Sequence, residues 1–243
     1  MIKNIEDIKQ LGTIMGIWAH PDDETWSSAG IMATAIAQGQ HVAVLSATNG
    51  DAGRTADETR WAQVSLRDIR QTELRNALAA VGVSDITFLD YQDDKLDTVD
   101  EEEILHIIER HVRAVQPDTI LTFEPSGITG HPDHKKISQW AQTVAKRIDA
   151  NITVYGAVTT RDNYEHIGKK ADEELNVFFA IDKPNLYDEK DLAIAYCLPK
   201  DIQVKKHAAF EAHASQTHAL MNHPIGKQLI DQAVEKEAFI RLK

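Results

Sequence analysis

The sequence predicts an α/β fold, a Rossmann-like and largely parallel sheet flanked by helices in a single domain. Short apolar runs alternate with segments of helical periodicity along much of the chain. Such alternation is typical of parallel strands joined by right-handed helical crossovers. The 243 residues fit one domain, and 42% hydrophobic residues are enough for its core. No repeat, low-complexity segment or linker divides the sequence, so we expect one domain over residues 1–243.

The elements follow in order from the apolar pattern. Strands are expected over residues 13–19, 41–47, 85–90, 118–124, 151–158 and 175–182. Helices are expected over residues 24–38, 59–80, 100–115, about 132–148, 201–213 and 226–239. The strands are short apolar runs, and the helices before residue 150 carry apolar residues at helical spacing. Gly39, Gly82 and Pro117 stand where the first three helices are expected to end.

The charge balance and the cysteine content exclude several kinds of protein. Asp and Glu number 38 against 26 Lys and Arg, which gives a net charge of −12. This balance disfavours nucleic acid as a partner, because phosphate backbones select basic surfaces. Cys197 is the only cysteine, so the sequence offers no intrachain disulfide and no thiolate cluster for a metal. Any metal must then be held by histidine and carboxylate side chains.

The N-terminus and the hydropathy argue against a membrane protein. The first residues, MIKNIEDIKQLGT, lack the long apolar segment of a signal peptide. No apolar run approaches the roughly 20 residues that cross a bilayer. We therefore expect a cytoplasmic protein with no membrane partner.

Polar residues follow four of the predicted strands. Residues 20–24 follow the first strand, 49–54 the second, Asp90 the third and 124–134 the fourth. Ligands of open α/β sheets bind beyond the carboxyl ends of the strands. We expect these segments at one edge of the sheet, while residues from about 150 to 243 complete the sheet and the substrate rim.

The segment HPDDE at residues 20–24 has two explanations. An Asp at a helix N-cap and acidic residues in the first turn stabilise a helix start, which alone would account for it. The segment HPDH at residues 131–134 also follows a strand and begins a helix. Capping does not favour histidine there, because protonated histidine is preferred at helix C-termini. Two such motifs at one edge favour a metal site.

A count of donors supports this interpretation. A catalytic zinc ion takes three protein ligands and leaves one position for water. His20, one Asp of the first motif and one His of the second motif would supply the three. The remaining carboxylate would act as a general base, and the remaining histidine as a proton donor. Zinc suits these ligand types, and iron, cobalt and nickel accept a similar set. The acidic run at 93–97 is expected to be solvated charge at a turn.

The motif AHPDDE (19–24), followed about 110 residues later by HPDH, resembles the PIG-L/LmbE-like family of zinc-dependent de-N-acetylases. Three segments support the resemblance: ATNGDAG (47–53) is similar to the Gly-rich turn of the family, RQTELRNALAAVGV (70–83) to its Arg-x-x-Glu helix, and KKHAAFEAHASQ (205–216) to its His-x-Ser-Gln helix. The resemblance spans about residues 13–216 and implies a Rossmann-like fold.

The resemblance implies specific roles in the two main motifs. His20, Asp23 and His134 would hold one Zn²⁺ per chain. Asp22 would be the general base for water. His131 would stabilise the oxyanion or protonate the leaving amine, with Asp133 orienting it.

Three further residues are candidates for contact with the substrate. Asp51 and Arg54 follow the second strand and could reach sugar hydroxyls or an anionic aglycone. The order of residues around Arg54 differs from the GTRG order of relatives, so a solvated loop arginine is the alternative. His213, in the His-x-Ser-Gln match, would be a rim residue near the metal, and a structural histidine is its alternative.

The resemblance implies a zinc hydrolase that removes the acetyl group of an N-acetylglucosamine-type amino sugar or its small glycoside. One alternative is an amidase that cleaves a larger acyl group, and another is a non-catalytic metal- or sugar-binding module. A nucleotide-binding Rossmann protein is disfavoured because no G-x-G-x-x-G follows the first strand. The expected partner is a small amino sugar. Residues after about 150 could also form a trimer or hexamer surface, as in some relatives.

Overall fold

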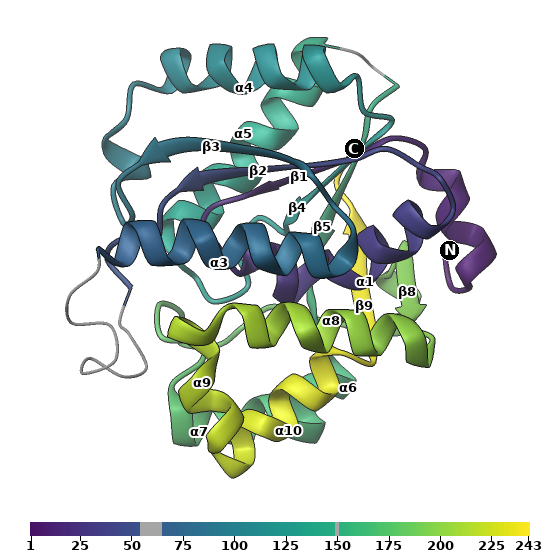
Figure 1. Ribbon diagram of the computed structural model, residues 1–243, viewed down its shortest axis with the longest axis vertical. Helices are drawn as coiled ribbons and strands as arrows, with labels where there is room; N and C mark the ends of the chain where they lie inside the picture. The colour runs from purple at the N-terminus through teal and green to yellow at the C-terminus, as the bar shows by residue number, and fades with distance from the viewer. Residues whose placement is uncertain (54–64, 149–150) are drawn as a thin grey trace.

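The computed structural model describes residues 1–53, 65–148 and 151–243. Its main sheet has seven strands in the order β3-β2-β1-β4-β5-β9-β8 (Figure 1). Their bounds are β1 (Ile14–Trp18), β2 (Val42–Thr48), β3 (Asp85–Tyr91), β4 (Thr119–Phe123), β5 (Thr153–Ala157), β8 (Ile194–Cys197) and β9 (Lys236–Arg241). Strands β1 to β5 run parallel to one another, and β9 is antiparallel to both β5 and β8.

Helices cover both faces of the sheet. They are α1 (Asp23–Ala37), α3 (Leu66–Val81) and α8 (Lys200–Ala212), which pack together, and the pair α4 (Glu101–Val115) and α5 (Pro132–Ile148). Figure 1 shows α4 and α5 on the side opposite α3 and α8. All residues of β1, β2 and β4 are consequently buried, which explains their uninterrupted apolar runs.

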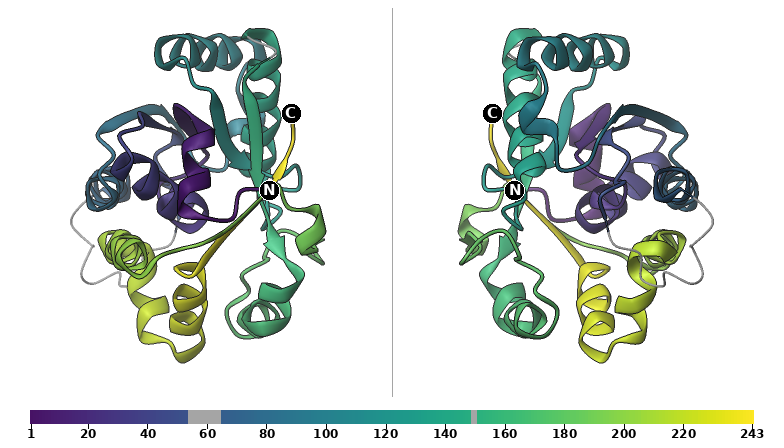
Figure 2. Two further views of the ribbon diagram at one scale, coloured as in Figure 1. Left: turned by 90° about the vertical axis from the view of Figure 1, so that its right-hand side faces the viewer. Right: turned by 90° about the vertical axis from the view of Figure 1, so that its left-hand side faces the viewer.

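A group of smaller elements lies away from α4 and α5. It consists of α9 (Ala214–Asn222), α10 (Pro224–Ala233), α6 (Arg161–Asn163), the π-helical turn η3 (Tyr164–Gly168), α7 (Lys169–Leu175) and the two-stranded pair β6 (Thr159–Thr160) and β7 (Leu186–Tyr187). Helix α10 packs on both α9 and α7. The side views in Figure 2 show these helices projecting together from the sheet. Short 3₁₀ turns are η1 (Ile5–Leu11), η2 (Leu96–Thr98) and η4 (Glu189–Asp191).

The predicted α/β order is confirmed through residue 157, with most element ends within two residues of the prediction. The second helix is the exception, because its described part begins at Leu66 and residues 59–64 lie outside the described ranges. Within those ranges, no helix is both long and apolar enough to span a bilayer.

The C-terminal part contains two wrong predictions. Residues 175–182 do not form a strand, because Asn176 ends α7 in the left-handed region and the chain then turns. The last helix ends at Ala233, and residues 236–241 form the strand β9. The strand was not predicted because Glu237, a charged residue, occupies an inward position and interrupts the apolar pattern. Glu237 is 2% exposed and pairs at 2.6 Å with the buried Lys206.

Candidate metal centre and active site

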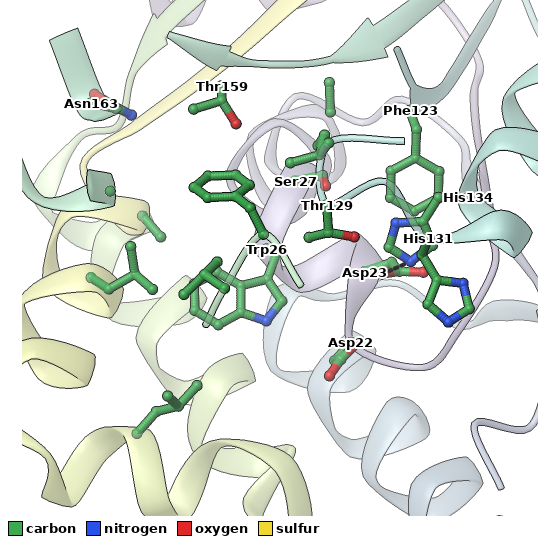
Figure 3. A pocket seen from close by; sticks show the side chains of 18 of the residues that line it. Asp22, Asp23, Trp26, Ser27, Phe123, Thr129, His131, His134, Thr159 and Asn163 are labelled. Carbon is green, nitrogen blue, oxygen red and sulfur yellow. Dashed lines mark ion pairs between the residues drawn. The ribbon is translucent and has the colours of Figure 1, made fainter. Parts of the chain in front are cut away.

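Side chains from both histidine motifs meet at the carboxyl ends of β1 and β4. His20, Asp22 and Asp23 follow β1, where the last two begin helix α1. His131 and His134 follow β4 and flank the start of α5. All five line one cavity of about 740 Å³. Figure 3 labels Asp22, Asp23, His131 and His134 in it. Residues more than 100 positions apart in sequence are therefore neighbours at this edge of the sheet.

Three side chains converge as donors of a metal site would. The Nδ1 atom of His20 lies 3.1 Å from Nε2 of His134. The carboxylate of Asp23 has Oδ2 at 3.5 Å from His20 Nδ1 and Oδ1 at 3.4 Å from His134 Nε2. Donors on a tetrahedron with zinc bonds of about 2.0–2.1 Å are about 3.3 Å apart. The set fits a single metal ion.

Neighbouring acceptors select the nitrogen with which each ring would face that ion. His134 Nδ1 donates to the Gly127 carbonyl at 2.9 Å, which leaves the Nε2 lone pair free. His20 Nε2 lies 2.8 Å from Asp93 Oδ1 and 3.2 Å from Asp133 Oδ2, so its proton is held there and Nδ1 can bind metal. Such outer contacts fix the tautomer of metal-binding histidines.

The charges of the donors also suit a cation. Burial lowers the pKa of His134 to about 4, so the ring is neutral at pH 7. Burial would raise the pKa of Asp23, but His134 and His20 outweigh it and hold that pKa low. Burial likewise opposes protonation of His20, yet the carboxylates of Asp133, Asp23 and Asp93 raise its pKa well above the ordinary value. A metal at this position would displace a proton from His20.

Two other groups among the described residues bring donor atoms within 4.8 Å of one another, His20–His131–His134 and His20–Asp93–Asp133. Asp133 is already engaged, because its oxygens accept the N–H groups of Asp94 at 2.8 Å and Leu96 at 3.1 Å. His131 Nδ1 accepts the N–H of Asp133 at 3.2 Å, so the neutral ring carries its proton on Nε2. These commitments favour the set that contains Asp23.

Asp22 lies beside the donors in a constrained turn. Its backbone is left-handed, with φ 110°, and its side chain forms no capping hydrogen bond with α1. Its N–H donates to Glu24 Oε2 at 3.0 Å, and its Oδ2 lies 3.3 Å from Arg70 Nη2. Burial raises the pKa of Asp22 to about 6, against the opposing charge of Arg70. Helix capping therefore does not account for Asp22.

Arg70 and Glu73 are structural supports that the sequence indicated only through the resemblance of their helix. Arg70 is buried and donates to the carbonyls of Gly50, at 3.0 Å, and Pro21. Glu73 accepts the N–H of Ser215 at 2.7 Å and its hydroxyl at 2.6 Å. The Arg-x-x-Glu spacing thus joins the Asp22 turn to the His-x-Ser-Gln segment.

The expectation for the acidic run at 93–97 was wrong at its first residue. Asp93 is only 6% exposed and pairs with His20 instead of facing solvent. Asp51 Oδ1 accepts the Asp93 N–H at 2.9 Å, and Asp51 itself is exposed and absent from the described lining of the cavity. Asp51 therefore stabilises the segment around Asp93, and the structure gives no indication of the predicted contact between Asp51 and a substrate. Arg54 lies outside the described residues.

His213 is a structural histidine, which was the alternative to a rim residue near the metal. The ring is fully buried, and its Nε2 lies 3.0 Å from Glu24 Oε1. Although burial opposes protonation, the Glu24 carboxylate raises the pKa of His213. The pair holds Glu24 beneath the Asp22 turn, so His213 cannot touch a substrate in this cavity.

His131 differs from the expectation in its partner. The carboxylate of Asp133 contacts His20, and only the backbone N–H of Asp133 contacts His131. The predicted orienting role of the Asp133 carboxylate is corrected accordingly. Burial and the neighbouring His20 lower the pKa of His131, which favours a neutral ring with Nε2–H as its donor.

The fold and the donor set define an α/β protein with a candidate mononuclear metal site at the carboxyl edge of its sheet. Residues 15–145 match the GlcNAc-PI de-N-acetylase family, PIG-L. The chain belongs to this family.

Named relatives are consistent with that membership. A probable N-acetyl-α-D-glucosaminyl L-malate deacetylase 2 of Bacillus subtilis is 31% identical over 168 residues, covering 68% of this chain and 75% of the relative. A 1D-myo-inositol 2-acetamido-2-deoxy-α-D-glucopyranoside deacetylase of Kineococcus radiotolerans is 30% identical in an alignment of 165 residues that covers 57% of this chain. That alignment spans 46%, about half, of the relative.

A solved structure shares the fold. The N,N'-diacetylchitobiose deacetylase of Pyrococcus horikoshii superposes with a TM-score of 0.63 at 20% identity, covering 97% of this chain and 85% of the other. At this identity the likeness concerns the fold alone.

Proposed function

We propose that this chain is a zinc-dependent hydrolase that removes the acetyl group from an N-acetylglucosamine-type amino sugar or its small glycoside. One observation carries the proposal. Asp22, a carboxylate with a raised pKa, stands next to a preformed His–Asp–His donor set inside one cavity. Family membership and the names of the relatives point to the same chemistry. Zinc is proposed because two imidazoles and one carboxylate form a typical catalytic zinc set.

The donors His20, Asp23 and His134 would hold the ion. When bound, zinc polarises the acetyl carbonyl and makes a water molecule more acidic. Asp22 takes the proton of the attacking water and delivers it toward the amine as the amide C–N bond breaks. Acetate and a free amino sugar are the products.

His131 would support the carbonyl oxygen. Its Nε2–H is the remaining donor of a neutral ring that lines the cavity. A donor aimed at an oxygen that gains negative charge lowers the barrier of acyl transfer. The lowered pKa of His131 suits this neutral donor.

The function is tested by acetate release from a panel of N-acetylglucosamine derivatives. Purified protein is assayed after zinc loading, after chelation and after zinc is returned. We expect release that disappears with the chelator and recovers with zinc. Zinc-loaded protein that releases acetate from none of the derivatives would refute the deacetylase proposal.

Arg70→Lys is expected to lower kcat by about 10- to 100-fold while zinc stays bound. Lysine keeps the charge but cannot bridge Asp22 and the two carbonyls as the guanidinium fork does. The measurement is kcat together with zinc content. Arg67→Lys is the matched control, since Arg67 lies on the same helix with a half-exposed partner, Asp90. An unchanged kcat in Arg70→Lys would show that the contact between Arg70 and Asp22 does not contribute to turnover.

A further inference from the structure

The cavity continues well beyond the metal centre. Its volume of about 740 Å³ lies within the roughly 300–1,000 Å³ of pockets that take drug-sized ligands. The histidines and carboxylates of the donor set line only one part of it. The remainder is lined chiefly by apolar side chains from α1, the α7 region, α9 and α10, notably Trp26, Leu175, Val177, Phe178, Leu220 and Leu229. Figure 3 shows the Trp26 ring facing this part, apart from His131 and His134.

These apolar side chains pack against other protein groups on one side and face the cavity on the other. Leu175, Val177 and Leu229 are partly buried and pack against a small cluster of buried residues formed by Ile167, Ala171 and Ile225. Trp26 and Leu220 pack in the same way against a second cluster, which includes Phe210. Their cavity-facing sides form a preformed apolar wall, so a ligand there gains burial without remodelling the protein.

Apart from Lys236, the charged side chains near this wall are already paired with other groups of the protein. Glu237 accepts the N–H groups of Gly30 at 2.7 Å and Ile31 at 2.8 Å, and it pairs with Lys206. Arg70 is held by Asp22 and backbone carbonyls. Outside the donor set and Arg70, Lys236 is the only lining cation that the structure describes. Recognition of a carboxylate or phosphate usually uses paired donors. The wall is therefore unsuited to an anionic substituent.

Two residues mark the junction between the polar and apolar parts. Thr129 Oγ1 is buried and has no hydrogen-bond partner within the described ranges, and Figure 3 places Thr129 between Trp26 and the histidines. A buried hydroxyl without a partner is costly, so a polar ligand atom there would satisfy it. Phe179 is 58% exposed, and its ring centroid lies 5.9 Å from that of His131. It offers an apolar surface at the cavity.

We propose that this wall, made by Trp26, Leu220, Leu229 and the 175–178 segment, binds an apolar substituent of the amino-sugar substrate. The substituent is either a long N-acyl chain or an apolar aglycone, and both present the same hydrocarbon to the wall. The inference rests on the proposed function for the orientation of the sugar, with its amide at the donor set. It adds the substrate class, an amphiphilic amino sugar.

The test compares two substrate series on the zinc-loaded protein. One series holds the methyl glycoside fixed and lengthens the N-acyl group from acetyl to butyryl and octanoyl. The other keeps N-acetyl and lengthens the aglycone from methyl to hexyl and octyl, with a malyl glycoside as the anionic comparison. We expect kcat/KM to rise at least tenfold along one series, because each buried methylene contributes about fourfold. The series that responds identifies the substituent. A flat response in both series, or a preference for the malyl glycoside, would overturn the inference.

A binding measurement keeps this inference separate from the deacetylase proposal. Calorimetry on the zinc-loaded Asp22→Asn variant, in which we expect little hydrolysis, measures Kd for octyl and methyl N-acetylglucosaminide, and N-octanoyl and N-acetyl glucosamine form the second pair. At least tenfold tighter binding of the longer member of a pair supports the wall, even if turnover is absent. Equal Kd values in both pairs would refute it, even if acetate is released.

Variants locate the effect at the wall. Leu229→Trp should reduce the preference for long substituents, because the larger side chain fills the cavity. Leu229→Ala should also reduce this preference, because contact with the substituent is lost. The control is Val204→Trp on α8, where Val204 is 70% exposed and outside the described cavity lining. It should leave the ratio of long to short substrates unchanged. A ratio unaffected by both Leu229 variants would place the substituent elsewhere and overturn the assignment.

Discussion

His134→Ala is expected to abolish stoichiometric zinc binding and all measurable acetate release. The variant removes Nε2, which lies 3.1 Å from His20 Nδ1 and 3.4 Å from Asp23 Oδ1. Loss of even an outer contact costs metal affinity about 10- to 100-fold, so loss of a direct donor should cost more. The measurement is zinc content by elemental analysis after dialysis, alongside acetate release at saturating substrate.

His207→Ala is the matched control for that experiment. His207 lies on α8, where its side chain is 3.5 Å from that of Glu211. It is absent from the described lining of the cavity. It should retain one zinc per chain and normal activity. If His134→Ala also retained one tightly bound zinc, the ion would have to lie in another group of donors, of which His20, Asp93 and Asp133 are the nearest described alternative.

Asp22→Asn is expected to keep zinc but lower kcat by about 10²- to 10⁴-fold, the usual contribution of a general base. Asparagine preserves the shape of the side chain and tolerates the left-handed backbone at this position, where φ is 110°. The amide cannot take a proton from water. Measurement of kcat and zinc content on the same preparation separates loss of the base from loss of the metal.

The pH profile provides a second readout for Asp22. The carboxylate must be ionised to act as a base, so wild-type kcat/KM should fall as the pH drops through its pKa. Burial raises that pKa to about 6, and a bound cation would lower it, so the acid limb should lie at or below about pH 6. The residual activity of Asp22→Asn should lack this limb. Asp90→Asn is the control, because Asp90 is exposed and also left-handed, with φ 62°. Normal turnover in Asp22→Asn would remove Asp22 as the base.

The fold was predictable as far as hydrophobic patterning follows burial. Strands β1, β2 and β4 are buried along their whole length, and their sequences are accordingly apolar without interruption. Patterning failed at β9, where the inward Glu237 depends on Lys206, a partner 31 residues away. It also failed at 175–182, where Leu175 and residues 177–179 line the cavity instead of forming a strand.

The candidate site was predictable only where its residues are adjacent in sequence. His20, Asp22, Asp23, His131 and His134 occur in two short motifs, each placed at the end of a strand. The supports that orient them come from elsewhere in the chain. Asp93 and Arg70 acquire their contacts with His20 and Asp22 through tertiary structure. Apart from the resemblance of the Arg70 helix, nothing local distinguishes them from solvated charges.

The left-handed turn at Asp22 lowers the stability of the fold at the residue that we propose as the general base. A side chain in such a conformation costs on the order of 1–3 kcal/mol, and Glu24, His213 and Arg70 are arranged to hold it there. Glycine would adopt this turn with less strain but would remove the carboxylate. Selection for stability alone would therefore keep the turn and lose the carboxylate that we propose as the base.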